Sequence, residues 1–346
     1  MPSADDIRSS PAWLEKTDRD DRAGFRQVFC TLARQKQPAA DGASPLCEEY
    51  LWLLQDEVTT AADLVPAQLP ERLRVFVVGG AFSDCFGEAS IAYRRGIDAL
   101  RDRGLDIATI PISSRSSSQI NSGMIASELQ TRHLVPADRV ILIGYSKGAI
   151  DILQFLSDYP DLGTRIDAVV SIAGPVWGSH VAEVGAWAYD SLLAHAFAGR
   201  CDPGDGGVVD SLLPEIRQTA MAENPPPAQI RYYSLLAFTT YEHLARGLRL
   251  GWRILSPVDR RNDGQVAPAE GTLPGSTLLG YANADHWAVA IDIEEELAFM
   301  AKRPEIRHYP REILIEAIIR YIGADLARNP APTTTPAISS RGRVTP

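Results

Sequence analysis

The segment 144–148, Gly-Tyr-Ser-Lys-Gly, constrains this chain more than any other part of its sequence. It follows the apolar run 140–143 and precedes a stretch, 149–156, whose apolar residues recur at helical spacing. A glycine on each side lets the backbone turn sharply between a buried strand and a helix, with the serine side chain exposed at the turn. The segment therefore predicts a strand, a tight turn and a helix that present Ser146 as a nucleophile.

A serine hydroxyl is a weak nucleophile at neutral pH, so a catalytic role for Ser146 demands a histidine base and an acid that holds the histidine. Among the six histidines, His286 follows the short apolar run 277–279 near the end of the folded region, where such a base is expected. The other five lie at a polar helix end, in a candidate lid or on amphipathic segments. We expect these to be surface or core histidines: His133, His180, His195, His243 and His308.

For the acid, the segment 261–266 contains Asn-Asp-Gly, a combination that favours a turn and can present a carboxylate from the end of a strand. We predict that Asp263 is this acid. Two alternatives lie nearby: Asp259, and Asp285, which adjoins the histidine and is badly placed to turn back onto its ring. A further alternative is that Asp263 only caps its own turn.

With this motif and this acid turn, the chain resembles the α/β-hydrolase superfamily, in particular bacterial lipases and carboxylesterases, over most of residues 73–323. The order Ser146, Asp263, His286 matches the order in which such proteins build their triads. The resemblance implies a serine hydrolase that cleaves carboxylic esters through an acyl-enzyme intermediate. The same triad would serve a thioesterase, an acyltransferase or a peptidase, and a non-catalytic ligand-binding protein of this fold is an alternative of another class.

The resemblance also implies an oxyanion hole after the apolar run 73–78. In the family a His-Gly or Gly-Gly pair follows this strand, and the next residue donates its backbone N–H. Here the pair 79–80 is Gly-Gly, where many lipases have histidine first, and the implied donors are Ala81, or Phe82 if the register slips by one, together with Lys147. For the Lys147 side chain we weigh a preference for anionic substrates against a solvated surface position, and we favour the second.

Short apolar runs alternate with helical patterns along the chain, which indicates a mostly parallel central sheet with helices on both faces. The carboxyl ends of parallel strands meet at one edge, so we expect the site residues to converge there. The predicted strands are 74–78, 106–110, 139–143, 168–172, 230–235 and 276–279.

The predicted organisation is one α/β-hydrolase domain with additions at both ends and one insertion. A closing helix, 311–322, is predicted to stop at Gly323. The divisions are a helical N-terminal extension at 1–70, the hydrolase domain at 71–328 with a candidate helical lid at about 178–228, and a disordered tail at 329–346.

Two polar stretches allow more than one interpretation. The serine-rich stretch 113–122 is either a loop over the site or a solvated linker. The Gly-Asp-Gly-Gly element at 204–207 lacks a full calcium-ligand pattern, and we predict a turn.

Composition excludes several classes of protein. With 346 residues, 45% of them hydrophobic, the chain can bury one large core. A net charge of −10 argues against a nucleic-acid partner. We expect a small-molecule acyl ester as substrate, no cofactor, no metal and no transmembrane segment, and the oligomeric state stays open.

The four cysteines are scattered and have no metal-site spacing. Together with an N-terminus that lacks the features of a signal peptide, this predicts reduced structural thiols in a cytoplasmic protein. A bridge between Cys30 and Cys47 is the open alternative; the other two cysteines are Cys85 and Cys201.

Overall fold

The computed structural model describes residues 17–36, 47–57, 71–85, 87–188, 201–292 and 309–328. Its centre is a seven-stranded sheet in the order β1-β7-β6-β5-β4-β2-β3, and every neighbouring pair is parallel. The predicted parallel sheet is thus confirmed, and all six predicted strands are present. The strands are β1 (Arg19–Asp20), β2 (Leu73–Val78), β3 (Asp106–Ile110), β4 (Arg139–Tyr145), β5 (Ala168–Ile172), β6 (Arg231–Phe238) and β7 (Thr277–Asn283).

Strand β4 shows why these runs form a two-sided buried sheet. Its side chains alternate between the faces, so that Ile141, Ile143 and Tyr145 pack in one apolar cluster while Val140 and Leu142 pack in another. A strand buried on both faces needs apolar residues at nearly every position. This is why the continuous apolar run, rather than an alternating one, predicted a central strand correctly.

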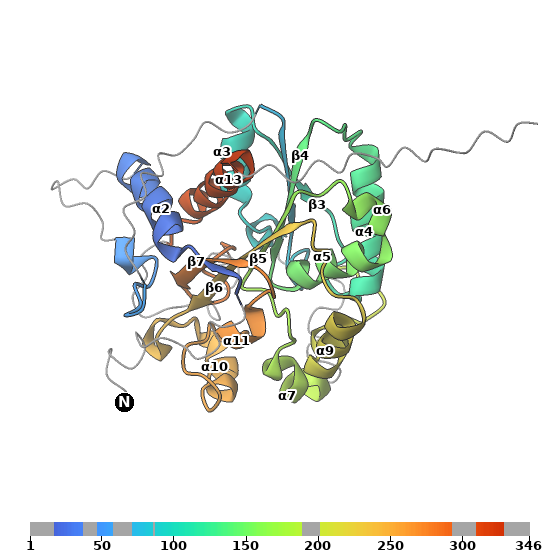
Figure 1. The fold of residues 1–346 in the computed structure, drawn as a ribbon. Helices are drawn as coiled ribbons and strands as arrows, with labels where there is room; N and C mark the ends of the chain where they lie inside the picture. The colour runs from blue at the N-terminus through green and yellow to red at the C-terminus, as the bar shows by residue number, and fades with distance from the viewer. Residues whose placement is uncertain are drawn as a thin grey trace, which may run out of the picture.

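Helices cover both faces of the sheet (Figure 1). Helices α2, α3 and α13 lie on one face, and α4 and α5 lie on the other. The α-helices are α2 (Arg22–Lys36), α3 (Arg94–Asp102), α4 (Ser118–Thr131), α5 (Lys147–Asp158), α6 (Pro160–Gly163), α7 (His180–Ala188), α9 (Pro214–Glu223), α10 (Arg249–Leu255), α11 (Pro268–Gly271) and α13 (Arg311–Arg328). The 3₁₀ turns are η2 (Cys47–Glu49), η3 (Gly87–Ser90), η5 (Asp210–Leu212), η6 (Tyr241–His243) and η7 (Arg246–Leu248).

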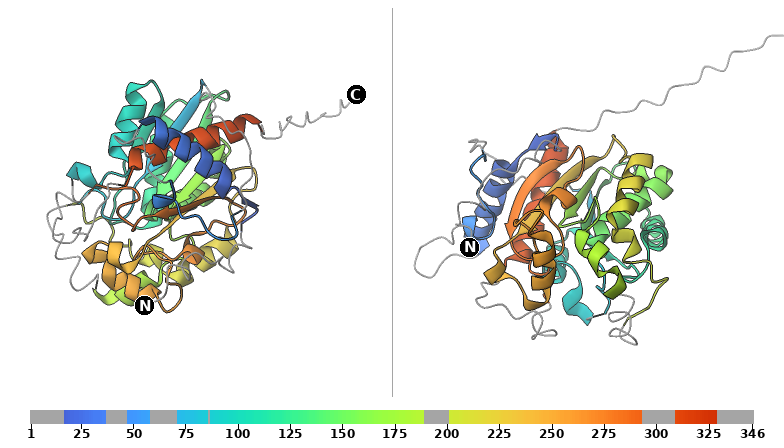
Figure 2. Two further views of the ribbon diagram at one scale, coloured as in Figure 1. Left: turned by 90° about the vertical axis from the view of Figure 1, so that its left-hand side faces the viewer. Right: turned by 90° about the horizontal axis from the view of Figure 1, so that it is seen from below.

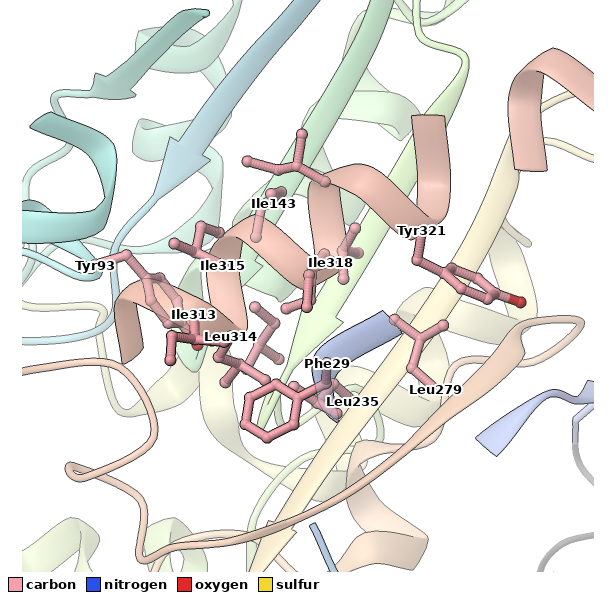
Figure 3. Packing of buried hydrophobic residues seen from close by; sticks show 14 of the residues in the cluster. Phe29, Tyr93, Ile143, Leu235, Leu279, Ile313, Leu314, Ile315, Ile318 and Tyr321 are labelled. Atoms are coloured by element: carbon pink, nitrogen blue, oxygen red, sulfur yellow. The ribbon is translucent and has the colours of Figure 1, made fainter. Parts of the chain in front are cut away.

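Helix α13 fills the larger apolar cluster, where its isoleucines lie over β4, β6 and β7 (Figure 3). The prediction that this helix stops at Gly323 is wrong, because it continues to Arg328. Beyond the glycine, Asp325 accepts hydrogen bonds from the Tyr233 hydroxyl at 2.7 Å and from Arg19 at 3.0 Å, and Leu326 is buried. These contacts outweigh the cost of about 1 kcal/mol for a glycine inside a helix.

The N-terminal part of the chain joins the same fold, as the two views in Figure 2 show. Strand β1 pairs with β7, and α2 packs against α13. The Arg22 side chain is buried and is held by the carboxylates of Asp20 and Asp56. The domain divisions remain predictions. The tail at 329–346 and residues 189–200 of the candidate lid at 178–228 lie outside the described residues.

An ion cluster ties α13 to α2 and α3. The carboxylate of Glu316 is buried and pairs with Lys36, with Arg103 at 2.6 Å and with Arg320 at 2.9 Å. Burial alone would raise the pKa of this carboxyl, but the hydrogen bonds from Arg103, Lys36 and Arg320 lower it from 4.5 to about 2. The charged form of Glu316 therefore stabilises the fold.

The fold should accordingly lose stability as the pH falls from 4.5 to about 2, because Glu316 takes up a proton in the unfolded chain before it does so in the folded one. The shift corresponds to at most about 3 kcal/mol at neutral pH. We expect Glu316→Gln to be less stable than the wild type at pH 7. Its free energy of unfolding, measured in urea, should also change less between pH 4.5 and about 2. Equal slopes for the two proteins would contradict this account.

Candidate active site

Ser146 lies in the predicted tight turn between β4 and α5. Its backbone has φ 53° and ψ −128°, a conformation that residues with side chains rarely adopt. The turn also needs its glycines: a Cβ at Gly144 would lie 2.4 Å from the Ala149 Cα, and one at Gly148 would lie 2.3 Å from the Val78 carbonyl oxygen. The hydrogen bond from the Ser146 N–H to the Ile172 carbonyl, at 2.9 Å, ties the turn to β5.

The structure brings Ser146, His286 and Asp263 together, although the first two are 140 positions apart in the chain. His286 Nε2 lies 2.8 Å from Ser146 Oγ, and His286 Nδ1 lies 2.7 Å from Asp263 Oδ2. Both His286 and Asp263 are buried. A hydroxyl, an imidazole and a carboxylate thus form one continuous hydrogen-bonded chain, which is the geometry that activates a serine.

The Asp263 carboxylate is held in a fixed orientation by its own turn. Oδ1 accepts hydrogen bonds from the N–H groups of Gln265 at 2.8 Å and Val266 at 2.7 Å, which leaves Oδ2 for the imidazole. Gly264 makes this turn possible with φ 92°. The His286 N–H also donates to the Asp263 carbonyl at 2.9 Å, so the two residues are joined through backbone and side chain.

The two alternative acids have other partners. Asp259 pairs with Arg261 at 3.0 Å. Asp285 is buried and accepts the N–H groups of Ala245 and Ala288, each at 2.8 Å. Asp285 therefore shapes the loop that carries the histidine instead of contacting the imidazole.

Two residues that the sequence analysis did not single out also hold this loop. The Tyr145 hydroxyl donates to the His286 carbonyl at 2.6 Å, and Arg311 donates to the Ala288 carbonyl at 3.0 Å. Burial raises the pKa of the Tyr145 phenol well above its ordinary value, so this group remains a donor at neutral pH. The position of Tyr145 beside the serine was the available signal, but only the fold shows what its hydroxyl reaches.

The loop after β2 lies directly beside the serine. A Cβ at Gly80 would lie 2.9 Å from the Ser146 Cβ, so only glycine fits there. The next N–H belongs to Ala81, and within the described residues it has no acceptor. The Phe82 N–H already donates to the Ser114 carbonyl at 3.2 Å, which favours Ala81 over Phe82 as the free donor. The Lys147 N–H opens α5, where the first N–H groups of a helix have no partner inside it.

Neither prediction for the Lys147 side chain is right. It is completely buried, and Nζ pairs with Asp151 one turn later at 2.6 Å. Asp151 also accepts hydrogen bonds from Ser118 and Asn121, each at 2.7 Å. The charge after the serine thus lies beneath the site in a buried polar network and faces neither substrate nor solvent.

The serine-rich stretch is part of that network rather than a solvated linker. Ser114, Ser116 and Ser118 are buried. The Gly-Asp-Gly-Gly element is a turn, as predicted, and Asp205 accepts hydrogen bonds from the Ser117 N–H at 2.7 Å and the Ser117 hydroxyl at 2.6 Å.

The prediction of reduced thiols is wrong, because all four cysteines form disulfides. Cys30 pairs with Cys47, the alternative left open above, and Cys85 pairs with Cys201 across 116 positions. That separation is why spacing could not reveal the second bridge. Disulfides persist mainly in oxidising compartments, so the prediction of a cytoplasmic location loses the support that it drew from the cysteines.

The second disulfide, Cys85–Cys201, fastens the middle of the candidate lid at 178–228 to the loop after β2. We use the term clasp for the segment 201–211, which is joined to that loop by this bridge and to the start of α4 by Asp205 and Ser211. The clasp therefore borders the loop that carries Ala81.

Among the described residues, the remaining histidines are not joined to the triad. His133, His180 and His243 are exposed to solvent, while His195 and His308 lie outside the described residues. Among the residues described, Asp84, Cys85 and Cys201 form a cluster of metal-ligand type, but its two sulfurs are joined to each other. No helix in the described part of the chain is long and apolar enough to cross a bilayer.

The buried pair of Lys147 and Asp151 makes a stability prediction. Lys147→Met should destabilise the protein by about 3–5 kcal/mol, because it leaves the Asp151 carboxylate buried without its cation. The double variant Lys147→Met/Asp151→Leu should recover part of this loss. Urea unfolding of both variants measures the difference, and a double variant no more stable than the single one would refute the pairing argument.

Comparison with solved structures supports the fold. Neither the models of protein families nor the curated proteins contain a match. Solved structures do: the metagenomic carboxyl esterase MGS0156 is 33% identical, with a TM-score of 0.78 over 94% of this chain and 97% of that one. Lipase BlEst2 of Bacillus licheniformis, in its mature form, is 25% identical over 68% of this chain and 90% of that one, with a TM-score of 0.49.

A third structure, lipase 1 from Pelosinus fermentans, is 10% identical, covers 73% of this chain and 98% of its own, and has a TM-score of 0.51. That likeness supports the fold alone. The similarity to the carboxyl esterase is closer and extends over nearly the whole of both chains. With its parallel sheet and the turn at Ser146, the chain belongs to the α/β-hydrolase superfamily and is similar to a carboxyl esterase of that superfamily.

Proposed function

We propose that this protein is a serine hydrolase that cleaves carboxylic esters through an acyl-enzyme intermediate. The observation that carries the proposal is the hydrogen-bonded chain from Asp263 through His286 to Ser146, at the carboxyl edge of the sheet. The likeness to a carboxyl esterase supports the same class of substrate.

In the first half of the proposed cycle, His286 Nε2 accepts the Ser146 proton while Oγ attacks the ester carbonyl. Asp263 keeps a proton on Nδ1 and stabilises the imidazolium as it forms. His286 then protonates the departing alcohol, and the acyl group remains on Ser146. In the second half, His286 activates a water molecule that releases the acid.

The negative charge of the tetrahedral intermediate needs donors that are already in place. We assign this role to the backbone N–H groups of Ala81 and Lys147, which lie on the two sides of the Ser146 turn. The close approach of Gly80 to Ser146 and the engagement of the Phe82 N–H with Ser114 support this choice. A donor of this kind contributes about 3–4 kcal/mol to the stability of the transition state.

The triad is tested by hydrolysis of p-nitrophenyl esters from acetate to palmitate. We expect Ser146→Ala and His286→Ala to lower kcat by at least about 10⁴-fold, and Asp263→Asn to lower it by about the same factor because the imidazole tautomer is lost. His243→Ala, which changes an exposed histidine, is the matched control and should retain full activity.

A labelling experiment separates a wrong mechanism from a wrong substrate. A fluorophosphonate should label the wild type once, and mass spectrometry should find the label on the peptide that contains Ser146. Folded His286→Ala should carry no label. Labelling without ester hydrolysis would retain the nucleophile and reject the substrate class. Absence of both in a folded wild type would reject the proposal.

The disulfide of the clasp can be tested in the same assay. The double variant Cys85→Ser/Cys201→Ser should lower kcat by about 10- to 100-fold, less than the complete loss of an oxyanion donor, because the loop that carries Ala81 loses its tether. The matched control is Cys30→Ser/Cys47→Ser, which removes the bridge between α2 and η2. Equal effects of the two pairs on kcat, after correction for stability, would contradict a role for the clasp at the site.

A further inference from the structure

Arg217, on α9, is a buried cation that lacks a carboxylate of its own. The residue is 3% exposed. Its Nε donates to the Val176 carbonyl at 3.4 Å, and within the described residues no carboxylate oxygen lies within 4.0 Å of the guanidinium. A buried charge is strongly unfavourable unless it is paired, so this position needs an explanation.

The nearest acid that acts on Arg217 cannot serve as its partner. Asp151 attracts the guanidinium electrostatically, but its oxygens are already engaged by Lys147, Ser118 and Asn121 at 2.6–2.7 Å. Lys147 and Asp151 cancel each other's charge. The positive charge of Arg217 therefore remains without a matched carboxylate among the described residues, and although burial lowers the pKa of Arg217 to about 10, the group stays protonated at neutral pH.

Arg217 lines a cavity of about 240 Å³ between α5, α9 and the chain that follows α9. Figure 1 shows these two helices on the same side of the sheet. The cavity is smaller than the 300–1,000 Å³ of typical drug-sized sites, so it fits a small ligand. Its walls combine apolar and polar side chains: Leu153, Leu156, Met221, Pro226 and Pro227 with Gln154, Ser157 and Asn224.

One acid, Glu223, also lines this cavity. It is exposed, and it makes no ion pair with Arg217 within 4.0 Å. The Glu223 carboxylate can therefore remain hydrated, and it does not neutralise the charge of Arg217 in the cavity.

The cavity is separate from the proposed catalytic residues. Leu153, the residue of α5 in the cavity wall that is nearest to Ser146, lies seven positions after it, which at about 1.5 Å per residue is about 10 Å along the axis of α5. A ligand here would not be the ester under attack.

We propose that this cavity binds a small organic carboxylate, with its oxygens on the Arg217 guanidinium and its short apolar tail against Leu153, Leu156 and Met221. A guanidinium matches a carboxylate through two parallel hydrogen bonds. The apolar walls favour a monocarboxylate with a hydrocarbon tail over inorganic phosphate or sulfate. The site stands independently of the proposed function; if that function holds, the acids that the enzyme releases belong to the same chemical class.

The test uses the full chain with Ser146→Ala, so that binding is measured without turnover and a failure of the proposed function leaves the test intact. Acetate, butyrate and hexanoate are titrated by calorimetry at constant ionic strength, beside butyramide, which has the same shape as butyrate without its charge, and beside phosphate. We expect saturable binding of butyrate, at least tenfold weaker binding of butyramide, and no preference for phosphate.

Two variants locate the site. Arg217→Met, added to this background, should weaken butyrate binding at least tenfold and should raise Tm without ligand, because the unmatched charge is gone. Ala220→Phe narrows the cavity and leaves Arg217 in place, and it should weaken binding similarly. Arg253→Met changes an exposed arginine on α10 outside the cavity; it is the control and should leave butyrate binding unchanged.

The opposite results are equally clear. No saturable binding of any carboxylate, or butyrate binding that Arg217→Met and Ala220→Phe leave unchanged, would overturn the proposal. Phosphate binding as tight as butyrate binding would show a site for any anion and would likewise overturn it.

Discussion

The close approach of the β4–α5 turn to β2 is the contact on which the rest of the site depends. Gly148 lies so near the Val78 carbonyl, and Gly80 so near Ser146, that neither position accepts a Cβ. At this contact Ser146 has its rare backbone conformation, and the loop after β2 lies beside its side chain. His286 and Asp263 then need only reach the same strand end, which the parallel order of β4, β5, β6 and β7 provides.

Much of this arrangement could be predicted from local patterns. Continuous apolar runs marked the central strands because both faces of the sheet are covered, and Gly-x-Ser-x-Gly marked the turn because only glycine fits at its two ends. Asn-Asp-Gly marked the acid turn for a similar reason: Gly264 needs a positive φ. Where one residue type alone satisfies a local geometry, sequence is informative.

What the sequence did not reveal depends on contacts between distant segments. The burial of Lys147 follows from Ser118 and Asn121 on α4, and the pairing of Cys85 follows from a segment 116 positions away. The continuation of α13 past Gly323 follows from Tyr233 and Arg19, on two different strands. In each case the local sequence suggested a solvent-exposed side chain, a free thiol or a helix end. A contact with a distant segment gives a different result.

The ion cluster around Glu316 lies away from the turn at Ser146, toward the edge where the strands begin. Arg103 and Arg320, which pair with Glu316, share a surface hollow with Arg72 and Asp106 at the amino ends of β2 and β3. The groups proposed for chemistry follow the carboxyl ends of the strands. Substitutions around Glu316 can therefore alter the stability of the fold in acid at one edge of the sheet and leave untouched the groups proposed for chemistry at the other.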